Sequence, residues 1–286
     1  MHGRFDYGIS NSLIVSLLVP IRVIAFFFIL LVVPFPAGAQ PLPHGFVFLR
    51  DVDPSIIQDM RYAGSNNFVG RPLPGYGSAQ CVLKQATADA LKLVQHELSQ
   101  ANLSLKMLDC YRPARAVRQM VKWVQDKDAP SDGRYFPRTN KAALISQGYI
   151  ASRSGHSTGN VVDLTLVDLS TAQPEQNSRV VFRSCISKEG ELFFDSSVDM
   201  GTSFDCFDPK SATESGEINA TQKQWRKTLV TAMAHHGFSN YSREWWHFSF
   251  QGGGTVFDFA IPEDLHSPVA PNPGPTNALG TKPAGN

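Results

Sequence analysis

The amino-acid sequence predicts an α+β fold in a single domain. Short apolar stretches typical of strands are interleaved with longer stretches that have the period of helices, over about 220 residues. The composition, with 42% hydrophobic and 18% charged residues, is that of an ordinary globular domain. No internal repeat is visible.

Strands are expected where apolar residues form short runs or alternate with polar ones, at 45–51, 103–109, 161–169 and 244–250. Residues 56–62 fit either a further strand or a short helix. The Gly, Pro and Asn residues of 64–77 indicate a loop.

Helices are expected at 87–100 and 222–236, the second ended by Gly237 in the usual cap position. Between them, Pro113 suits the first position of a helix. A shorter helix would end before Gly148. The residues expected to face inward are Ala90, Leu91, Val94 and Leu98 in the first helix, Ala116, Val117, Met120, Val121 and Val124 after Pro113, and Trp225, Leu229 and Met233 in the last.

The N-terminal residues 1–39 have the pattern of a secretory signal peptide. Arg4 precedes a strongly apolar run at 23–33, and Ala37-Gly38-Ala39 supplies the small residues of a cleavage site. The alternative is an uncleaved membrane anchor, because 13–33 are nearly long enough to span a bilayer. We therefore expect an exported protein, periplasmic or secreted.

The folded domain is expected at 40–265. The remaining residues, 266–286, hold five prolines and no apolar period, which predicts a disordered tail. Residues 1–39 contain two of the 26 basic and one of the 25 acidic residues, so the mature chain carries 24 of each. This balance argues against nucleic acid or an anionic membrane surface as the main partner. The sequence leaves the oligomeric state open.

Four cysteines, an even number, suggest two disulfides in an exported protein. Proximity in the sequence favours Cys81–Cys110 and Cys185–Cys206, although three pairings are possible. A cysteine metal site is disfavoured, because no Cys-x-x-Cys spacing occurs.

Two segments carry the chemistry. His156 and Asp163 flank the Gly159 turn ahead of an expected strand, and Glu244 and His247 lie in a late one. Two imidazoles and a carboxylate are ligands that zinc commonly takes, and the remaining carboxylate could act as a base on a bound water. In a regular strand Glu244 and His247 would point to opposite faces, so Glu244 is expected on a turn before the strand or beside a bulge.

These motifs, Ser154-x-His156-x-x-Gly159-x-x-x-Asp163 and Glu244-x-Trp246-His247, resemble those of the zinc D-Ala-D-Ala peptidase superfamily. Three further segments resemble its dipeptidase branch of the vancomycin-resistance type: Met60-Arg-Tyr62 with Asn66-Asn-Phe68 and Gly70, Asp109-Cys-Tyr-Arg-Pro113, and Asp199-Met-Gly-Thr-x-Phe-Asp205. The resemblance implies a mainly antiparallel central sheet with flanking helices and a zinc site at the sheet.

The resemblance also implies roles for single residues. One Zn²⁺ would be bound by His156, Asp163 and His247. Glu244 would be the general base, and Arg112 would stabilise the oxyanion. The residues expected to bind a small D,D-dipeptide are Asp199, Tyr62 and Ser154, with Asp199 and Tyr62 receiving its free ammonium group.

Plainer interpretations remain beside these. Arg112 could be a structural ion-pair partner, Asp199 could only shape a turn, and Trp245 and Trp246 are most simply core aromatics. We interpret His235 and His236 as structural residues at a helix C-terminus, and His96 as solvent-exposed.

The sequence departs from the superfamily pattern at two places. Val161 stands where Ala is usual, and the segment 170–206 is long for the family. Alternative functions are a D,D-carboxypeptidase acting on stem peptides of peptidoglycan and a zinc-stabilised binding module without activity. An exported dipeptidase would act on dipeptide released from peptidoglycan rather than on a cytoplasmic pool.

Overall fold

The computed structural model of this chain describes Gly3 and residues 41–171, 184–187, 196–251 and 253–263. Met1–Gly38 forms one unit and Ala39–Asn286 the other. The predicted signal peptide, apart from Gly3, and the predicted tail therefore lie outside the described residues. Within the described part of the chain, no helix combines the length and apolar character needed to cross a membrane.

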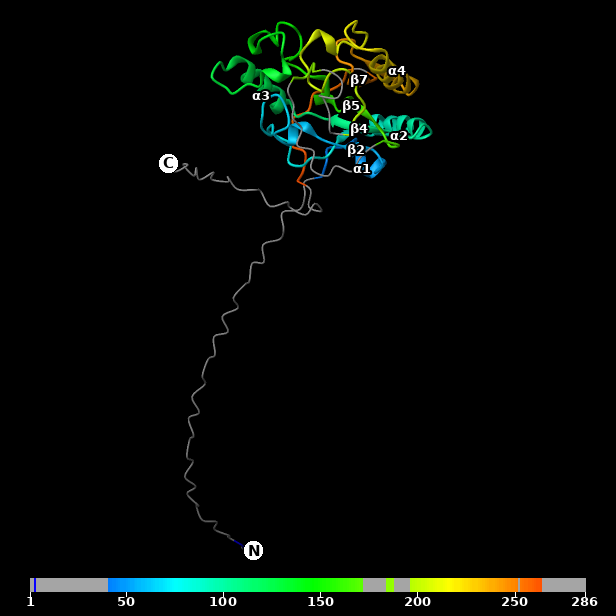
Figure 1. Cartoon of the computed structure of the whole chain (residues 1–286). Helices are drawn as coiled ribbons and strands as arrows, with labels where there is room; N and C mark the ends of the chain where they lie inside the picture. The colour runs from blue at the N-terminus through cyan, green and yellow to red at the C-terminus, as the bar shows by residue number, and fades with distance from the viewer. Residues whose placement is uncertain (1–2, 4–40, 172–183, 188–195, 252, 264–286) are drawn as a thin grey trace, which may run out of the picture. The chain divides into compact units, whose positions relative to one another are not determined.

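A five-stranded sheet forms the centre of the domain (Figure 1). The strand order is β2 (Ile57–Gln58), β4 (Leu103–Asp109), β5 (Val161–Asp168), β7 (His247–Phe250) and β6 (Phe238–Asn240). β2 runs parallel to β4, and the other neighbours are antiparallel. This arrangement confirms the predicted α+β fold. A second, two-stranded antiparallel sheet pairs β1 (Phe46–Phe48) with β3 (Val82–Lys84).

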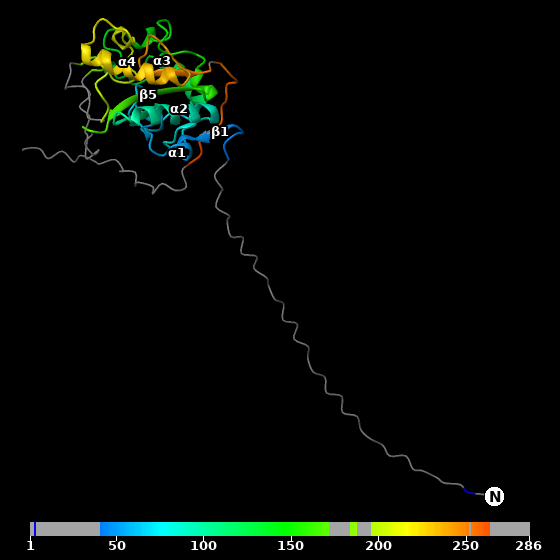
Figure 2. The same ribbon diagram turned by 90° about the vertical axis from the view of Figure 1, so that its right-hand side faces the viewer.

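Helices cover the sheet. The helix α2 (Gln85–Ser99) packs against β4 and against α4 (Ala220–His235), which also contacts β5 and β6. The helix α3 (Ala114–Gln125) lies on the other side of the domain from this pair in Figure 1, and Figure 2 shows the same domain turned by 90°. A short helix, α1 (Leu49–Val52), completes the set of α-helices in the described residues. Because β4 and β5 are covered on both faces, their side chains are buried almost throughout.

The expected helices are present, with ends that differ by one or two residues. α4 begins earlier than expected because Asn219 and Gln222 form a capping box, a signal that was readable in the sequence. Pro113 is the N-cap of α3 rather than its first residue. Trp225 is only half-buried, whereas its neighbour Arg226 is buried.

The expected strands need more correction. Residues 45–51 divide into β1 and α1, and residues 56–62 contain both β2 and a 3₁₀ turn at Arg61–Ala63. The short helix before Gly148 is a 3₁₀ turn at Lys141–Ala143. The strand β6 was missed because three residues carry too little periodicity to distinguish it.

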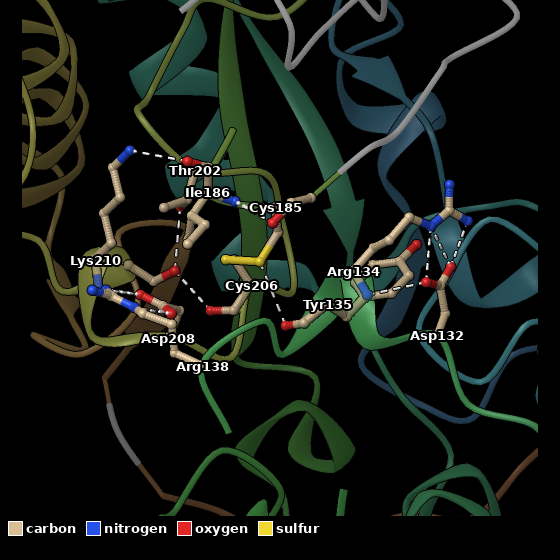
Figure 3. The surroundings of a disulfide bond; sticks show 12 residues. Asp132, Arg134, Tyr135, Arg138, Cys185, Ile186, Thr202, Cys206, Asp208 and Lys210 are labelled. Atoms are coloured by element: carbon tan, nitrogen blue, oxygen red, sulfur yellow. Dashed lines mark hydrogen bonds and ion pairs between the residues drawn. A yellow bond between two sulfur atoms is a disulfide. The ribbon is translucent and has the colours of Figure 1, made fainter. Parts of the chain in front are cut away.

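Both disulfides favoured by sequence proximity are present. Cys81 pairs with Cys110, and Cys185 pairs with Cys206, as Figure 3 shows for the second pair. The first joins the residue before β3 to the residue after β4. The second joins residues 184–187 to the loop that follows Asp199.

We predict that the Cys81→Ser, Cys110→Ser double variant loses about 2–4 kcal/mol of unfolding free energy, because a cross-link restricts the unfolded chain. Urea unfolding of the mature domain measures this. When a reductant is added to both proteins, the parent should unfold at the midpoint of the variant, because neither then has a disulfide. Equal midpoints for the oxidised parent and the variant would contradict the prediction.

Candidate active site

Three side chains from separate segments converge at one end of the central sheet: His156, Asp163 and His247. His156 Nε2 lies 3.2 Å from Asp163 Oδ2, and His247 Nδ1 lies 3.0 Å from Asp163 Oδ1. The two imidazole nitrogens are 3.4 Å apart. The structure thus brings together the three residues that were expected as metal ligands.

This donor set fits a zinc ion. Two imidazole nitrogens and one carboxylate oxygen are typical zinc ligands. His156, Asp163 and His247 each offer one such atom, and these three atoms lie within 4.8 Å of one another. Burial by itself would raise the pKa of the Asp163 carboxyl, but the two imidazoles outweigh burial and hold this pKa below its usual range.

Strand register places the carboxylate and one imidazole. Asp163 in β5 lies opposite His247 in β7 on one side and opposite Asp109 in β4 on the other. Residues directly opposite in neighbouring strands project to the same face of a sheet. Three adjacent strands therefore present Asp109, Asp163 and His247 in a row.

A 3₁₀ turn at Gly155–Thr158 places the second imidazole. The His156 backbone N–H donates to Ser154 Oγ, and Gly159 ends the turn with a left-handed φ of 80°. His156 Nδ1 donates to the Cys110 carbonyl at 2.8 Å, which leaves Nε2 free to face the cluster. Ser154 therefore orients the turn that carries His156.

Val161, where the superfamily usually has Ala, is accommodated by a glycine. A Cβ on Gly155 would lie 2.8 Å from Val161 Cγ2, too close for any other residue at 155 without a shift. The larger side chain of Val161 thus occupies space that Gly155 leaves open.

Glu244 lies on the turn before β7. Its backbone N–H donates to the Tyr241 carbonyl, and its carbonyl accepts from the His247 N–H. Because β7 begins only at His247, the opposite-face problem of a regular strand does not arise. Glu244 Oε2 lies 3.7 Å from His247 Nδ1. Burial raises the pKa of the Glu244 carboxyl to about 8, against the opposing influence of His247.

Arg112 lies beside the cluster, with 12% of its side chain exposed. Its Nε and Nη2 atoms lie 2.8 and 2.7 Å from Asp109 Oδ2, and Nη2 lies 3.4 Å from Asp163. The guanidinium also lies over the Tyr62 ring at 4.8 Å. Burial would lower the pKa of Arg112, but the Asp109 carboxylate raises it well above the usual value, so the side chain stays charged.

These groups open onto one cavity of about 240 Å³. It is small beside pockets of about 300–1,000 Å³ that hold drug-sized ligands, and so suits a small substrate. The predicted site residues that line it are Tyr62, Arg112, Ser154, Asp163, Glu244 and His247. The buried Trp246 lines it as well, whereas Trp245 packs against Trp246.

Asp199 does not belong to this cavity, contrary to the expectation that it binds substrate. Its oxygens accept hydrogen bonds from the Gly201 N–H at 2.7 Å and from Gln222 Nε2 at 2.9 Å, so it shapes a turn and ties it to α4. Asp205, six residues later, lines the cavity instead.

Asp205 and Tyr62 form the polar pair at this part of the cavity. The Tyr62 hydroxyl lies 3.0 and 2.9 Å from the two Asp205 oxygens. Burial, together with the Asp163 charge, raises the pKa of the Asp205 carboxyl to about 8. The sequence contained this residue in the same motif as Asp199, but offered no means of choosing between the two.

Three other histidines lie elsewhere. His235 Nδ1 and His236 Nε2 lie 3.0 and 2.8 Å from the two carboxylate oxygens of Glu97, so they link α4 to α2. His96 is exposed on α2. The structural interpretation of these histidines agrees with their positions.

A cluster that can hold a metal ion, next to a buried glutamate and an arginine, is the arrangement of a metal-dependent hydrolase. The model of the peptidase M15 family, described as D-ala-D-ala dipeptidase, matches residues 43–176 and 187–264. The chain belongs to this family and is therefore a peptidase. The unmatched residues 177–186 fall within 170–206, the segment that is long for the family.

Relatives match over nearly their whole length. The chain is 33% identical to a D-alanyl-D-alanine dipeptidase of Enterococcus faecalis (strain ATCC 700802 / V583), over 77% of this chain and 100% of that protein. It is also 33% identical to a D-alanyl-D-alanine dipeptidase of Streptomyces coelicolor (strain ATCC BAA-471 / A3(2) / M145), over 76% of this chain and 98% of that protein.

Among solved structures, one similar chain is the vancomycin resistance D,D-dipeptidase VanXYg in complex with a D-Ala-D-Ala phosphinate analog. The TM-score is 0.32 and the sequence identity is 15%, over 72% of this chain and 66% of that chain. The family assignment rests on the sequence matches.

The raised pKa of Asp205 gives a prediction for the metal-free protein. A carboxyl with a pKa near 4 when unfolded and about 8 when folded contributes stability below pH 4 that is lost as the pH rises to 8, by at most about 1.4 kcal/mol per pH unit. The Asp205→Asn variant has no carboxyl at this position, so its unfolding free energy should not show this fall between pH 4 and pH 8.

Thermal unfolding between pH 4 and pH 8.5 therefore should show the parent losing stability relative to Asp205→Asn as the pH rises. Asp89→Asn, on the exposed face of α2, is the matched control and should follow the parent. If the melting temperatures of the parent and Asp205→Asn changed with pH in parallel, the raised pKa of Asp205 would be refuted.

Proposed function

We propose that this chain hydrolyses the dipeptide D-Ala-D-Ala to two D-Ala, using one Zn²⁺ held by His156, Asp163 and His247. The observation that carries the proposal is that Asp163 and His247 of this cluster line one small cavity together with Glu244 and Arg112. The names of the relatives support the choice of substrate.

Zinc, when bound, would supply a Lewis acid that polarises the scissile carbonyl and lowers the pKa of water. The chain's own residues would do the rest. Glu244 would take a proton from the attacking water and deliver it to the leaving amine. Glu244 Oε2 lies 3.7 Å from His247 Nδ1, so its carboxyl stands beside the expected metal ligands.

Arg112 would stabilise the negative charge that develops on the scissile carbonyl oxygen. Asp109 holds the guanidinium through two of its nitrogens, and the ring of Tyr62 lies beneath it. A fixed cation in a buried site stabilises a developing charge without having to reorient, which contributes several kcal/mol in comparable sites.

Asp205 and Tyr62 would receive the free ammonium group of the dipeptide. An ammonium ion beside Asp205 would favour the charged carboxylate that burial disfavours. A peptide with a blocked amino end offers no such charge and would leave the buried pair without a partner. This favours a dipeptidase over the alternative of a D,D-carboxypeptidase on stem peptides.

A zinc-stabilised binding module is the remaining alternative. It would need neither a buried glutamate nor an arginine at the metal cluster, because a structural zinc is simply enclosed by its ligands. Both side chains line the cavity, and this favours the enzyme.

We also propose that the enzyme is exported and acts on dipeptide released from peptidoglycan. Its support is the signal-peptide pattern of 1–39 and the two disulfides, since disulfides persist in oxidising compartments. Mass analysis of the protein from the native host should give a chain that begins at Gln40. An intact N-terminus would instead support the membrane-anchor alternative.

Glu244→Ala is expected to keep zinc but lose turnover of D-Ala-D-Ala by about 10²–10⁴-fold, because only the proton carrier is removed. Turnover and zinc content are measured on the mature domain. Chelation of the parent should abolish turnover, and added Zn²⁺ should restore it. Full activity in the variant, or in the chelated parent, would sink the proposal.

Asp205→Asn is expected to raise KM for D-Ala-D-Ala by about tenfold or more, because the ammonium group loses a charged partner worth about 1.5–3 kcal/mol. Asp199→Asn is the matched control and should change KM by less than about threefold. If KM rose more in Asp199→Asn than in Asp205→Asn, Asp199 rather than Asp205 would be the residue that binds the ammonium group.

A further inference from the structure

The loop from Met200 to Ala212 carries Asp205. This residue has a left-handed φ of 58°, which is uncommon outside glycine although aspartate adopts it more often than most residues. Contacts from outside the loop also hold it. The disulfide between Cys185 and Cys206, shown in Figure 3, fixes the middle of the loop at the residue that follows Asp205 in the sequence.

The two ends of the loop are held by one side chain of α4. Arg226 Nε donates to the Met200 carbonyl at 2.8 Å, and Nη1 donates to the Ala212 carbonyl at 2.6 Å. Nη1 and Nη2 both donate to the Lys210 carbonyl at 3.2 Å. The guanidinium thus joins the beginning of the loop to its end.

This arginine has no partner that would explain its burial as an ion pair. It is 1% exposed, and no carboxylate among the described residues lies within ion-pair distance of it. Burial lowers its pKa to about 10. The Asp199 and Glu214 carboxylates oppose this shift from beyond ion-pair distance. The direct partners of the guanidinium are therefore the three carbonyls, and their hydrogen bonds offset part of the cost of burying it.

We propose that Arg226 is a positioning residue that sets the preference for a free amino end, by closing the loop that holds Asp205 in the cavity. The inference rests on the proposed function for its kinetic readout, since Asp205 is there the partner of the ammonium group. Arg226 itself lies outside the cavity lining and touches no substrate.

The geometry of the guanidinium explains why arginine is required. It presents five N–H donors in a rigid fork and so can reach three carbonyls at once. A lysine offers its donors from a single atom and could reach only some of the three carbonyls. A methionine of similar length would leave the Met200 and Lys210 carbonyls without this donor, whereas the Ala212 carbonyl would keep its hydrogen bond from the Ser215 N–H.

The test compares Arg226→Met and Arg226→Lys with Lys227→Met, an exposed neighbour on the same helix. Steady-state kinetics are measured with D-Ala-D-Ala and with its N-acetyl derivative, and bound zinc is measured in each protein. Thermal unfolding verifies that each variant is folded under the assay conditions.

For Arg226→Met we expect KM for D-Ala-D-Ala to rise about tenfold or more, as a displaced binding group would cause, while kcat changes less than about threefold. Hydrolysis of the N-acetyl derivative and zinc content should match the parent. The ratio of kcat/KM for D-Ala-D-Ala to kcat/KM for the N-acetyl derivative should therefore fall. The KM of Arg226→Lys should lie between the values of the parent and Arg226→Met. The KM of Lys227→Met should equal that of the parent. An unchanged preference in Arg226→Met would overturn the inference.

Hydrogen exchange tests the role of Arg226 without relying on enzyme activity. It also remains informative if the Arg226→Met variant fails to fold, because it uses Arg226→Lys. Backbone amides of 200–212 should exchange faster in Arg226→Lys than in Lys227→Met, whereas those of β5 should not differ. Equal exchange in 200–212 would overturn the inference even if the parent hydrolyses D-Ala-D-Ala. If the parent does not hydrolyse D-Ala-D-Ala, the proposed function is overturned. Hydrogen exchange in 200–212 would then be the measurement that decides whether Arg226 holds the loop.

Discussion

The buried carboxylate of Asp163 is the constraint on which the rest of the site depends. It lies in the middle strand of the three that present polar groups at this end of the sheet, and so has little access to water. A charge in that position requires positive or hydrogen-bonding neighbours. His156, His247 and Arg112 supply them, and the same arrangement leaves ligand atoms facing one point, where a metal ion can be held.

The parts of the site are also tied to one another through the backbone. Cys110 provides the carbonyl that orients His156, and it is cross-linked to Cys81 at the end of the neighbouring small sheet. On the opposite flank, the Trp245 N–H donates to the Ser211 carbonyl, which connects the turn of Glu244 to the loop of Asp205. Side chains of the candidate site that come from distant parts of the sequence thus share rigid supports, which precise placement of these groups requires.

Much of the site was predictable because its residues lie in short local motifs. The spacing of His156 and Asp163 around Gly159, and of Glu244 and His247, identified the cluster, and the resemblance that these motifs carry identified Arg112 and Tyr62. Asp205 was not distinguished from Asp199, because both occur in one motif. Only the left-handed turn at Asp205 and the hydrogen bonds of Asp199 separate the residue that faces the cavity from the one that shapes a turn.

The sequence by itself determined the order of the main elements, the helix faces, the favoured disulfide pairs and the types of group at the active site, since each depends on neighbours close in the chain. Tertiary structure alone decided the register that places Asp109, Asp163 and His247 in a row, the accommodation of Val161 by Gly155 and the burial of Arg226 against backbone carbonyls. These features depend on contacts between residues far apart in the sequence, and periodicity and local motifs carry no information about such contacts.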